Sequence, residues 1–420
     1  MISGKQLLPI LIGAALGAGG WLYGLRSGSA SGGFGADERL RIAEEEIQML
    51  KAENDSLRSL AQGGGEVSVP QEMIDKVEKD HGLNFLSNPV VNMIAGEELG
   101  YRIEAALESR LGPQGMGDRE EAYRRIGWLK SGDRLLTQLV AVRSVGALAW
   151  FDEQTGEAWV TDQFNLKNVP DQAAMVRVLV RILLHQHFPP APTYPGDDAA
   201  RAREALHAGA ASAAVSRFYA DAAKGVGFMP LKENGPAQRL MLSLPDFIQG
   251  VTLFPALAGK DLVRSSYVKG TEEFTKTFRD PRQTTYQIVL PAEDVREVEI
   301  KFPEIGDEIF LRESAGYLGL RLWIEEMGDV GVAEEIARAW VADAFLLFGD
   351  GEMSSGLIWD IELESKDFAD RLERLSGVRA EAMKATRVGR FFGVNRISPT
   401  RIRFLNTATA KTLEKFSATE

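Results

Sequence analysis

Residues 175–188 read Met-Val-Arg-Val-Leu-Val-Arg-Ile-Leu-Leu-His-Gln-His-Phe, and this segment constrains the fold more than any other. It is apolar at nearly every position before His185, and its two charged residues, Arg177 and Arg181, lie one helical turn apart. A helix with so little polar surface has to be buried on most sides. We therefore predict a central buried helix over residues 175–188, which the prolines that follow bring to an end.

The segments around this helix predict an α+β fold in which helices dominate. A strand pair is expected at 147–151 and 157–161, because the two runs alternate and a polar turn ending in Gly156 joins them. A further short strand is expected at 297–301. Periodic apolar residues predict helices at 71–80, 97–111, 119–129, 133–143 and 198–222, the last rich in alanine and suited to close packing. His81, followed by Gly82, is expected to be a structural residue at a helix C-terminus.

Composition excludes several functions. The 420 residues carry a formal net charge of −12 and no basic stripe, so nucleic acid is not expected as a partner. There is no cysteine, which excludes disulfides, thiol catalysis and cysteine-bound zinc.

The N-terminal part predicts a membrane protein. Residues 7–25 lack charge and are long enough to span a bilayer, with a cleaved signal peptide as the alternative. After a Gly/Ser linker at 27–35, heptad spacing over 36–62 predicts a parallel coiled-coil dimer, with a single solvated helix as the alternative. The contacts of that dimer would be made by Leu40, Ile47, Leu50, Asn54 and Leu57. We thus expect a transmembrane anchor (1–26), a linker (63–70), a globular domain (71–395) outside the cytoplasm, periplasmic or extracellular, and a C-terminal tail (396–420).

Several motifs of the globular part resemble those of a bacterial family of predicted zinc metallopeptidases, of the zincin-like type. The family's active-site helix carries HExxH and ends in Asp-Gln-His-Phe, which matches Gln186-His187-Phe188 here. The resemblance covers roughly residues 71–375 and includes segments 150–152, 206–209, 253–256, 284–291, 340–345 and 359–360. It implies a zincin-like fold with a substrate cleft beside the central helix.

The same resemblance implies that the chemistry has been lost. In this alignment the positions of the two zinc-binding histidines, the catalytic glutamate and the third ligand hold Arg177, Arg181, Val178 and Ala208. Tyr286 stands where the family has an acid. Arginine stays cationic and has no lone pair for a metal, so zinc is not expected. The sequence thus predicts an inactive metallopeptidase homologue that binds a protein or peptide in its cleft or serves as a scaffold.

Four alternatives stay open. A displaced metal site would use His185, His187 and His207, although residues two apart on a helix point in different directions. Arg177 and Arg181, with His185, His207 and Tyr286 as further candidate binding residues, would hold a carboxylate or phosphate. Otherwise the helix arginines form a solvated stripe or pair with acids such as Asp197, Asp198 or Glu204. As a third function, the chain would be a structural coiled-coil tether.

Overall fold

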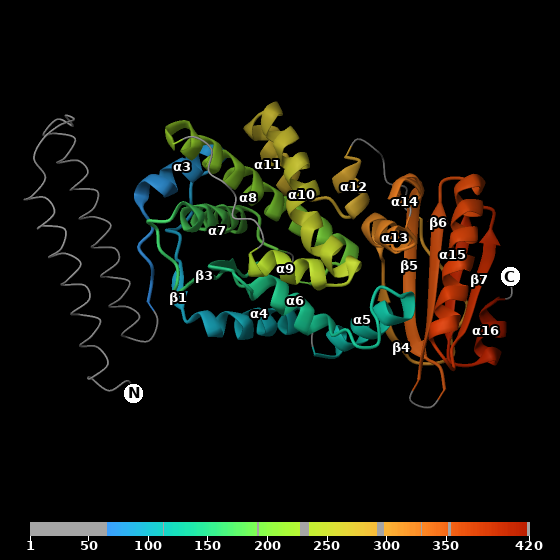
Figure 1. Cartoon of the computed structure of the whole chain (residues 1–420). Helices are drawn as coiled ribbons and strands as arrows, with labels where there is room; N and C mark the ends of the chain where they lie inside the picture. Colours follow the sequence, from blue (N-terminus) through green and yellow to red (C-terminus); the bar gives the residue numbers. More distant parts are fainter. Residues whose placement is uncertain are drawn as a thin grey trace, which may run out of the picture. The chain divides into compact units, whose positions relative to one another are not determined.

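The computed structural model describes residues 65–111, 113–190, 193–226, 235–291, 298–328, 330–351 and 354–417, drawn in colour in Figure 1. They belong to one compact unit, Glu53–Glu420. The fold of this unit is α+β, with helices α3 to α16 and two sheets. The predicted span at 7–25, the linker at 27–35 and the coiled coil at 36–62 with its dimer contacts lie outside the described residues.

The predicted membrane architecture is contradicted by the described part of the chain. None of the helices described there is both long and apolar enough to cross a bilayer. The two longest, α8 (Asp197–Val226) and α10 (Asp246–Lys269), have the length but carry charged residues along it. The membrane-anchored fold class and the single-pass localisation are therefore corrected, and neither is retained below.

The first part of the unit combines four helices with a small sheet. The elements are α3 (Gln71–His81), β1 (Asn92–Ile94), α4 (Gly96–Leu111), α5 (Pro113–Ile126), α6 (Leu135–Ser144), β2 (Ala149–Phe151) and β3 (Ala158–Thr161). β3 is central, parallel to β1 and antiparallel to β2. The expected linker at 63–70 is partly ordered against this sheet, because the Val67 amide donates to the Val91 carbonyl at 2.7 Å. His81 ends α3 as expected: its Nδ1 bonds the Val77 carbonyl at 2.7 Å, and Gly82 has a φ of 64°.

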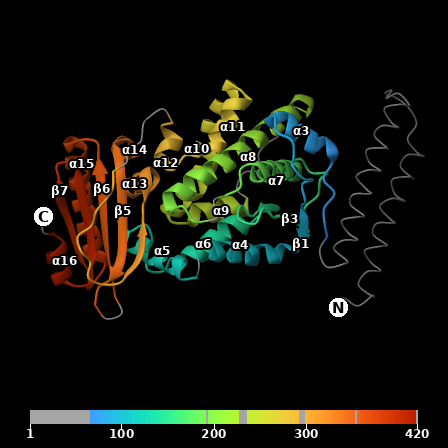
Figure 2. The same cartoon turned by 180° about the vertical axis from the view of Figure 1, so that it is seen from behind.

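The central helix is α7 (Val169–His187), which is longer than predicted because Pro170 lies in its first turn, where proline is tolerated. Helices α9 (Pro236–Ser243), α11 (Thr271–Arg279) and α12 (Thr285–Val289) complete this part. α8 packs between α7 and α10 (Figure 2). Close packing of the alanine-rich α8 is confirmed: a Cβ added to Gly259 of α10 would lie 1.8 Å from the Ala205 carbonyl oxygen.

The last part of the unit is an antiparallel sheet of five strands in the order β4-β5-β6-β8-β7. Its elements are β4 (Ile309–Glu313), α13 (Gly316–Glu325), α14 (Val330–Arg338), β5 (Trp340–Gly349), β6 (Ser355–Leu363), α15 (Lys366–Thr386), β7 (Phe391–Ser398), β8 (Arg401–Thr407) and α16 (Ala410–Ser417). Two predictions are wrong here. Residues 298–301 are irregular rather than a strand, and the expected tail at 396–420 supplies the end of β7, all of β8 and α16.

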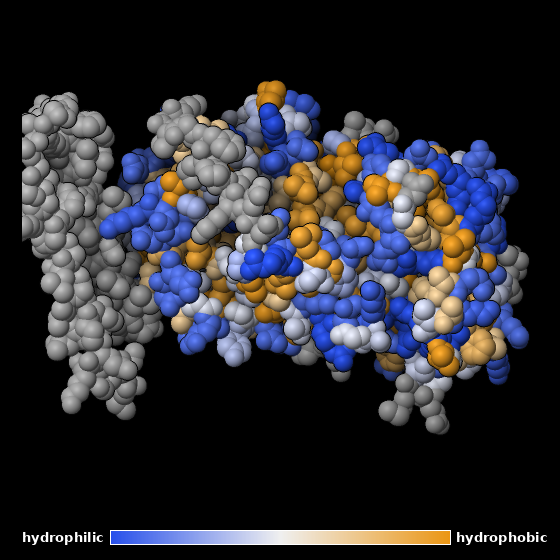
Figure 3. All heavy atoms as spheres, in the orientation of Figure 1, coloured by the Kyte–Doolittle hydropathy of each residue, from blue (hydrophilic) through white to orange (hydrophobic). Residues whose placement is uncertain are grey.

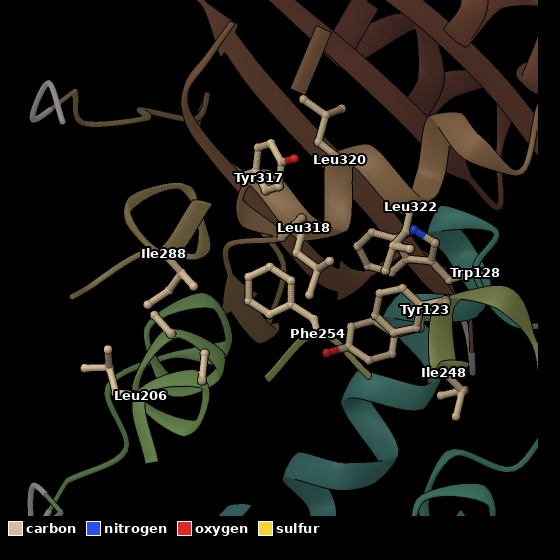
Figure 4. Packing of buried hydrophobic residues seen from close by; sticks show 14 of the residues in the cluster. Tyr123, Trp128, Leu206, Ile248, Phe254, Ile288, Tyr317, Leu318, Leu320 and Leu322 are labelled. Carbon is tan, nitrogen blue, oxygen red and sulfur yellow. The ribbon is translucent and has the colours of Figure 1, made fainter. Parts of the chain in front are cut away.

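The sheet has two buried faces. One face, with Phe345, Trp359 and Phe404, joins the main core together with α13 and α15. The other, with Leu346 and Phe348, is covered by Phe416 of α16 and by Ile305. The main core continues into the helical part, where Figure 4 shows aromatic and aliphatic side chains from several elements in contact. The surface in Figure 3 is mainly hydrophilic, and apolar side chains gather over α9 and α10.

Candidate functional site

A pocket of about 1170 Å³ opens beside α7 and is called the α7 pocket here. Its walls are α7, α8, the ends of α4, α6 and α11, and β2 with the turn that follows it. The residues predicted from the central helix line it together: Arg177, Val178, Arg181, His185 and His187 from α7, with His207 from α8. The pocket therefore lies beside the helix at which the resemblance implies a substrate cleft.

The helical repeat explains how α7 presents these side chains. Arg177, Arg181 and His185 are four residues apart, so they share one face. Ten other residues of the helix are buried, including Val178 and Leu179. The apolar faces fix α7 in the core, and its one polar face borders the pocket.

Arg181 is held by acids of two neighbouring elements. Its guanidinium forms an ion pair with Glu153 of the hairpin turn. Burial lowers the pKa of Arg181, Glu204 of α8 opposes that shift, and Arg143 of α6 adds to it. Arg181 is thus neutralised within the protein, although not by Asp197 or Asp198.

Arg177 has a different environment. Its side chain is exposed into the pocket, and no carboxylate of the described residues forms an ion pair with it. Desolvation by the surrounding protein lowers its pKa, and the nearby Tyr219 of α8 opposes this shift. Arg177 is therefore a desolvated cation without a counter-ion in the described part of the chain.

The three histidines of the region point to different neighbours. His185 packs edge-on against Phe151, with ring centroids 5.7 Å apart, and lies close to Gly156 of the hairpin turn. His207 packs against Phe278 at 5.5 Å. His187 Nε2 bonds the Asn84 carbonyl at 2.8 Å, which is the structural role that the motif implies.

Two of the histidines that line the pocket, His185 and His207, are kept neutral near pH 7. Burial lowers the pKa of His207 to about 3, and the charge of Arg181 and the nearby His185 add to the effect. Burial also lowers the pKa of His185, against the attraction of Asp152. These two histidines therefore add no positive charge to that of the pocket arginines.

Of the other charged groups of the pocket, the sequence named only Glu204, as a possible partner of the helix arginines. Arg143 and Arg203 line it, and each has a buried nitrogen, Nη1 and Nε respectively, with no acceptor among the described residues. Arg110 and Arg279 line it as well. The acids of the lining are Asp152, Glu153 and Glu204, so six arginines face three carboxylates. These residues come from the hairpin turn and from α4, α6, α8 and α11, and only the fold brings them to α7.

Four predicted positions lie elsewhere or have other partners. Tyr286 of α12 contacts the rings of Tyr317 and Trp340 and is not part of the pocket. Ala208 is buried and does not line it, whereas Glu204, one turn earlier, does.

Asp197 and Asp198, considered as partners of the helix arginines, are engaged by other groups. Asp197 accepts from Arg119, Tyr123 and Tyr194, and Asp198 accepts from the amide and hydroxyl of Thr285. Neither is available to the α7 pocket.

The main chain also contributes to the pocket. Along the β2–β3 pair, the Leu148 carbonyl accepts a hydrogen bond from the Thr161 amide, and the Asp152 amide donates one to the Glu157 carbonyl. The intervening Trp150 lies opposite Trp159. Because backbone groups alternate in direction along an antiparallel strand, Ala149 and Phe151 point theirs away from β3. No other described strand pairs with β2, and residues 148–154 line the pocket.

Within the described residues, no group of three or more histidine, aspartate or glutamate side chains is placed to hold a metal ion. No family model, no curated protein and no solved structure matches this chain. The zinc metallopeptidase resemblance therefore stays a prediction that rests on the motif residues alone.

Proposed function

We propose that this chain is a non-catalytic, metallopeptidase-like binding protein that holds an extended peptide segment in the α7 pocket. The observation that carries the proposal is the free edge of β2, with which no other described strand pairs, along a pocket of about 1170 Å³. This volume exceeds the range of roughly 300–1000 Å³ typical of small-molecule sites. An extended peptide that adds to a sheet edge gains main-chain hydrogen bonds, and side-chain pockets supply its specificity.

The lining supports such a ligand. Trp150, Phe188 and Phe278 supply apolar surface, while the backbone groups of Ala149 and Phe151 supply donors and acceptors. A peptide strand needs both. A hydrolase acting through the inherited positions would need a metal or a base, and Arg177, Val178 and Arg181 offer neither.

The test uses the full chain and a library of end-blocked octapeptides with randomised positions. We expect enrichment of a sequence class, and slower amide exchange at Ala149 and Phe151 when a selected peptide binds. Ala149→Pro removes one edge N–H without removing a β2–β3 bond, so it is expected to weaken binding about tenfold. Ala149→Ser keeps the N–H and serves as its control.

Two outcomes would overturn the proposal. Failure to enrich any peptide, with the protein folded, removes the binding function. Zinc at one equivalent in protein purified without chelators, measured by elemental mass spectrometry, removes the non-catalytic assignment; we expect less than about a tenth of an equivalent. Should Ala149→Pro fail to fold, the exchange measurement on the unmodified chain decides.

A further inference from the structure

The charge of the α7 pocket is opposite to that of the chain. The chain as a whole has a net charge of −12, yet six arginines and three carboxylates line the pocket. His185 and His207 are neutral near pH 7 and do not change this excess. A local field of one sign inside a cavity with low-dielectric walls selects ligands of the other sign.

The pocket also has hydrogen-bond donors to spare. Arg143 Nη1 and Arg203 Nε are buried and have no acceptor among the described residues. A buried donor left unpaired is unfavourable, and a ligand in the pocket supplies the acceptors that these two nitrogens lack. Carboxylate oxygens, which accept several bonds each, are the natural complement of such donors.

Arg177 and Arg181 differ although they lie on the same helical face. Arg181 already has Glu153 as its partner and Glu204 nearby. Arg177 is an exposed residue of the pocket lining, lies near Tyr219, and forms no ion pair with a described carboxylate. A guanidinium binds a carboxylate in two parallel hydrogen bonds, and a partly desolvated one binds it more strongly than one in water.

We infer that the peptide bound in the α7 pocket carries an acidic side chain, and that Arg177 is the specificity-determining residue that binds its carboxylate. This inference rests on the proposed function and specifies its ligand class. Arg143 and Arg203 supply further donors for acidic residues along the same segment. Arg181 keeps its ion pair with Glu153 and does not bind the carboxylate of the peptide.

The experiment compares three full-length proteins on the octapeptide library: the unmodified chain, Arg177→Met and Arg264→Met. Arg264 is an exposed arginine of α10 outside the pocket, so its variant controls for loss of one positive charge. The unmodified chain and Arg264→Met are expected to enrich aspartate or glutamate at one position, and Arg177→Met is expected to lose that preference.

Affinity measurements then test the contact between Arg177 and the acidic side chain of the peptide. For the best acidic peptide, Arg177→Met is expected to raise Kd about tenfold, and Arg177→Lys to raise it by less. The same peptide with glutamine in place of the acid is expected to bind the unmodified chain and Arg177→Met equally well.

The outcomes separate the two proposals. Enrichment without any acidic preference, or an acidic preference unchanged in Arg177→Met, overturns this inference and leaves peptide binding intact. Absence of all enrichment overturns peptide binding itself. Loss of the acidic preference in Arg264→Met to the same degree would show a general charge effect and also overturns the role of Arg177.

Discussion

The five-stranded sheet with α13 to α16, called the sheet region here, treats its arginines differently from the α7 pocket. Arg403 binds both carboxylate oxygens of Asp360, at 2.7 and 2.8 Å. Arg396 reaches two acids and Arg401 one, all within 2.7 Å. In the pocket, Arg143, Arg177 and Arg279 form no ion pair with any described carboxylate.

The two sets of arginines therefore have different roles: those of the first set stabilise the fold, and those of the second are free to bind a ligand. A buried charge is stable only when it is paired and hydrogen-bonded, and Arg396, Arg401 and Arg403 of the sheet region meet this condition with neighbouring acids. The pocket does not meet it with the residues described. Its cationic groups are therefore better explained by a ligand that completes them than by a role in the stability of the fold.

The largest expected effect comes from the most heavily bonded acid of the sheet region. Asp343 is buried and accepts five hydrogen bonds, from Ser314 Oγ, the Ala315 and Gly316 amides, and the indoles of Trp340 and Trp359. Asp343→Ala leaves all of these donors without their acceptor, so we expect a loss of about 4–5 kcal/mol in the free energy of unfolding. Urea denaturation followed by tryptophan fluorescence measures it.

Asp343→Asn is the variant to compare with Asp343→Ala. It keeps one acceptor oxygen but turns an NH₂ group towards the remaining donors, so we expect a smaller but still large loss. A loss below about 1 kcal/mol for Asp343→Ala would show that the sheet region does not depend on the hydrogen bonds to its buried acids, and the contrast with the pocket would disappear.

The secondary structure of a region can be predicted from the sequence only where its residues carry a local signal. α7 and the β2–β3 hairpin carry local signals: an apolar helix, an alternating pair of runs and a turn ending in Gly156. Residues 340–349 and 355–363 are buried along almost their whole length, so β5 and β6 show no alternation that would identify them as strands. The expected strand at 297–301 alternates but finds no partner strand.

Residues of the candidate site could be predicted to lie together only where they belong to the same helix. Arg177, Arg181 and His185 share a helix face, and their common position in the pocket follows from their spacing. The pairing of Arg181 with Glu153 joins residues from two elements, so no local pattern contains it. Tyr286 was placed by motif resemblance, and the packing of α12 against Tyr317 and Trp340 puts it elsewhere.

A second prediction tests whether the two regions differ in packing as well as in charge. A Cβ on Gly259 would overlap the backbone of α8, with the Ala205 carbonyl oxygen at 1.8 Å. Because neither backbone can move without separating α8 from α10, Gly259→Ala is expected to cost about 3 kcal/mol. Thermal and urea unfolding measure the change.

The matched control is Gly377→Ala in α15, where a new Cβ meets no atom within 4 Å. Alanine favours the helix, so this variant is expected to be neutral or more stable by up to about 1 kcal/mol. Equal tolerance of both substitutions would contradict tight packing behind the pocket. If Gly259→Ala is destabilising and Gly377→Ala is not, the helices behind the pocket are tightly packed. The α7 pocket and the sheet region then differ in the pairing of their arginines.

The third prediction concerns Asp198, a buried acid whose hydrogen-bond donors are neutral. Burial raises its pKa to about 7, the Thr285 hydroxyl opposes the shift, and the charge of Asp343 adds to it. The native state therefore holds a proton that the unfolded chain, with a pKa of 3.8, releases. Its contribution to stability is present below pH 4 and is lost as the pH rises to 7, by up to about 1 kcal/mol per pH unit.

Asp198→Asn removes this dependence while keeping an oxygen for the Thr285 bonds. We expect the variant to gain stability relative to the unmodified chain between pH 4 and pH 7, measured by urea unfolding at each pH. His81, whose pKa burial lowers to about 4, acts in the opposite direction, but it is common to both proteins and cancels in the difference. A difference that does not change with pH would contradict the buried, protonated state of Asp198.

The smallest expected effect on stability is that of replacing Arg177, the pocket arginine without a described counter-ion. Arg177→Met removes a desolvated cation that lacks a counter-ion, so no acid is left unpaired and the free energy of unfolding should change by less than about 0.5 kcal/mol. Arg403→Met, the same substitution in the sheet region, leaves the fully buried Asp360 without its partner and should cost about 3 kcal/mol or more. Differential scanning calorimetry of the two variants under identical conditions gives the comparison directly. If Arg177→Met destabilises the protein as much as Arg403→Met does, Arg177 is held by folding contacts, and its place in the pocket no longer argues for a ligand.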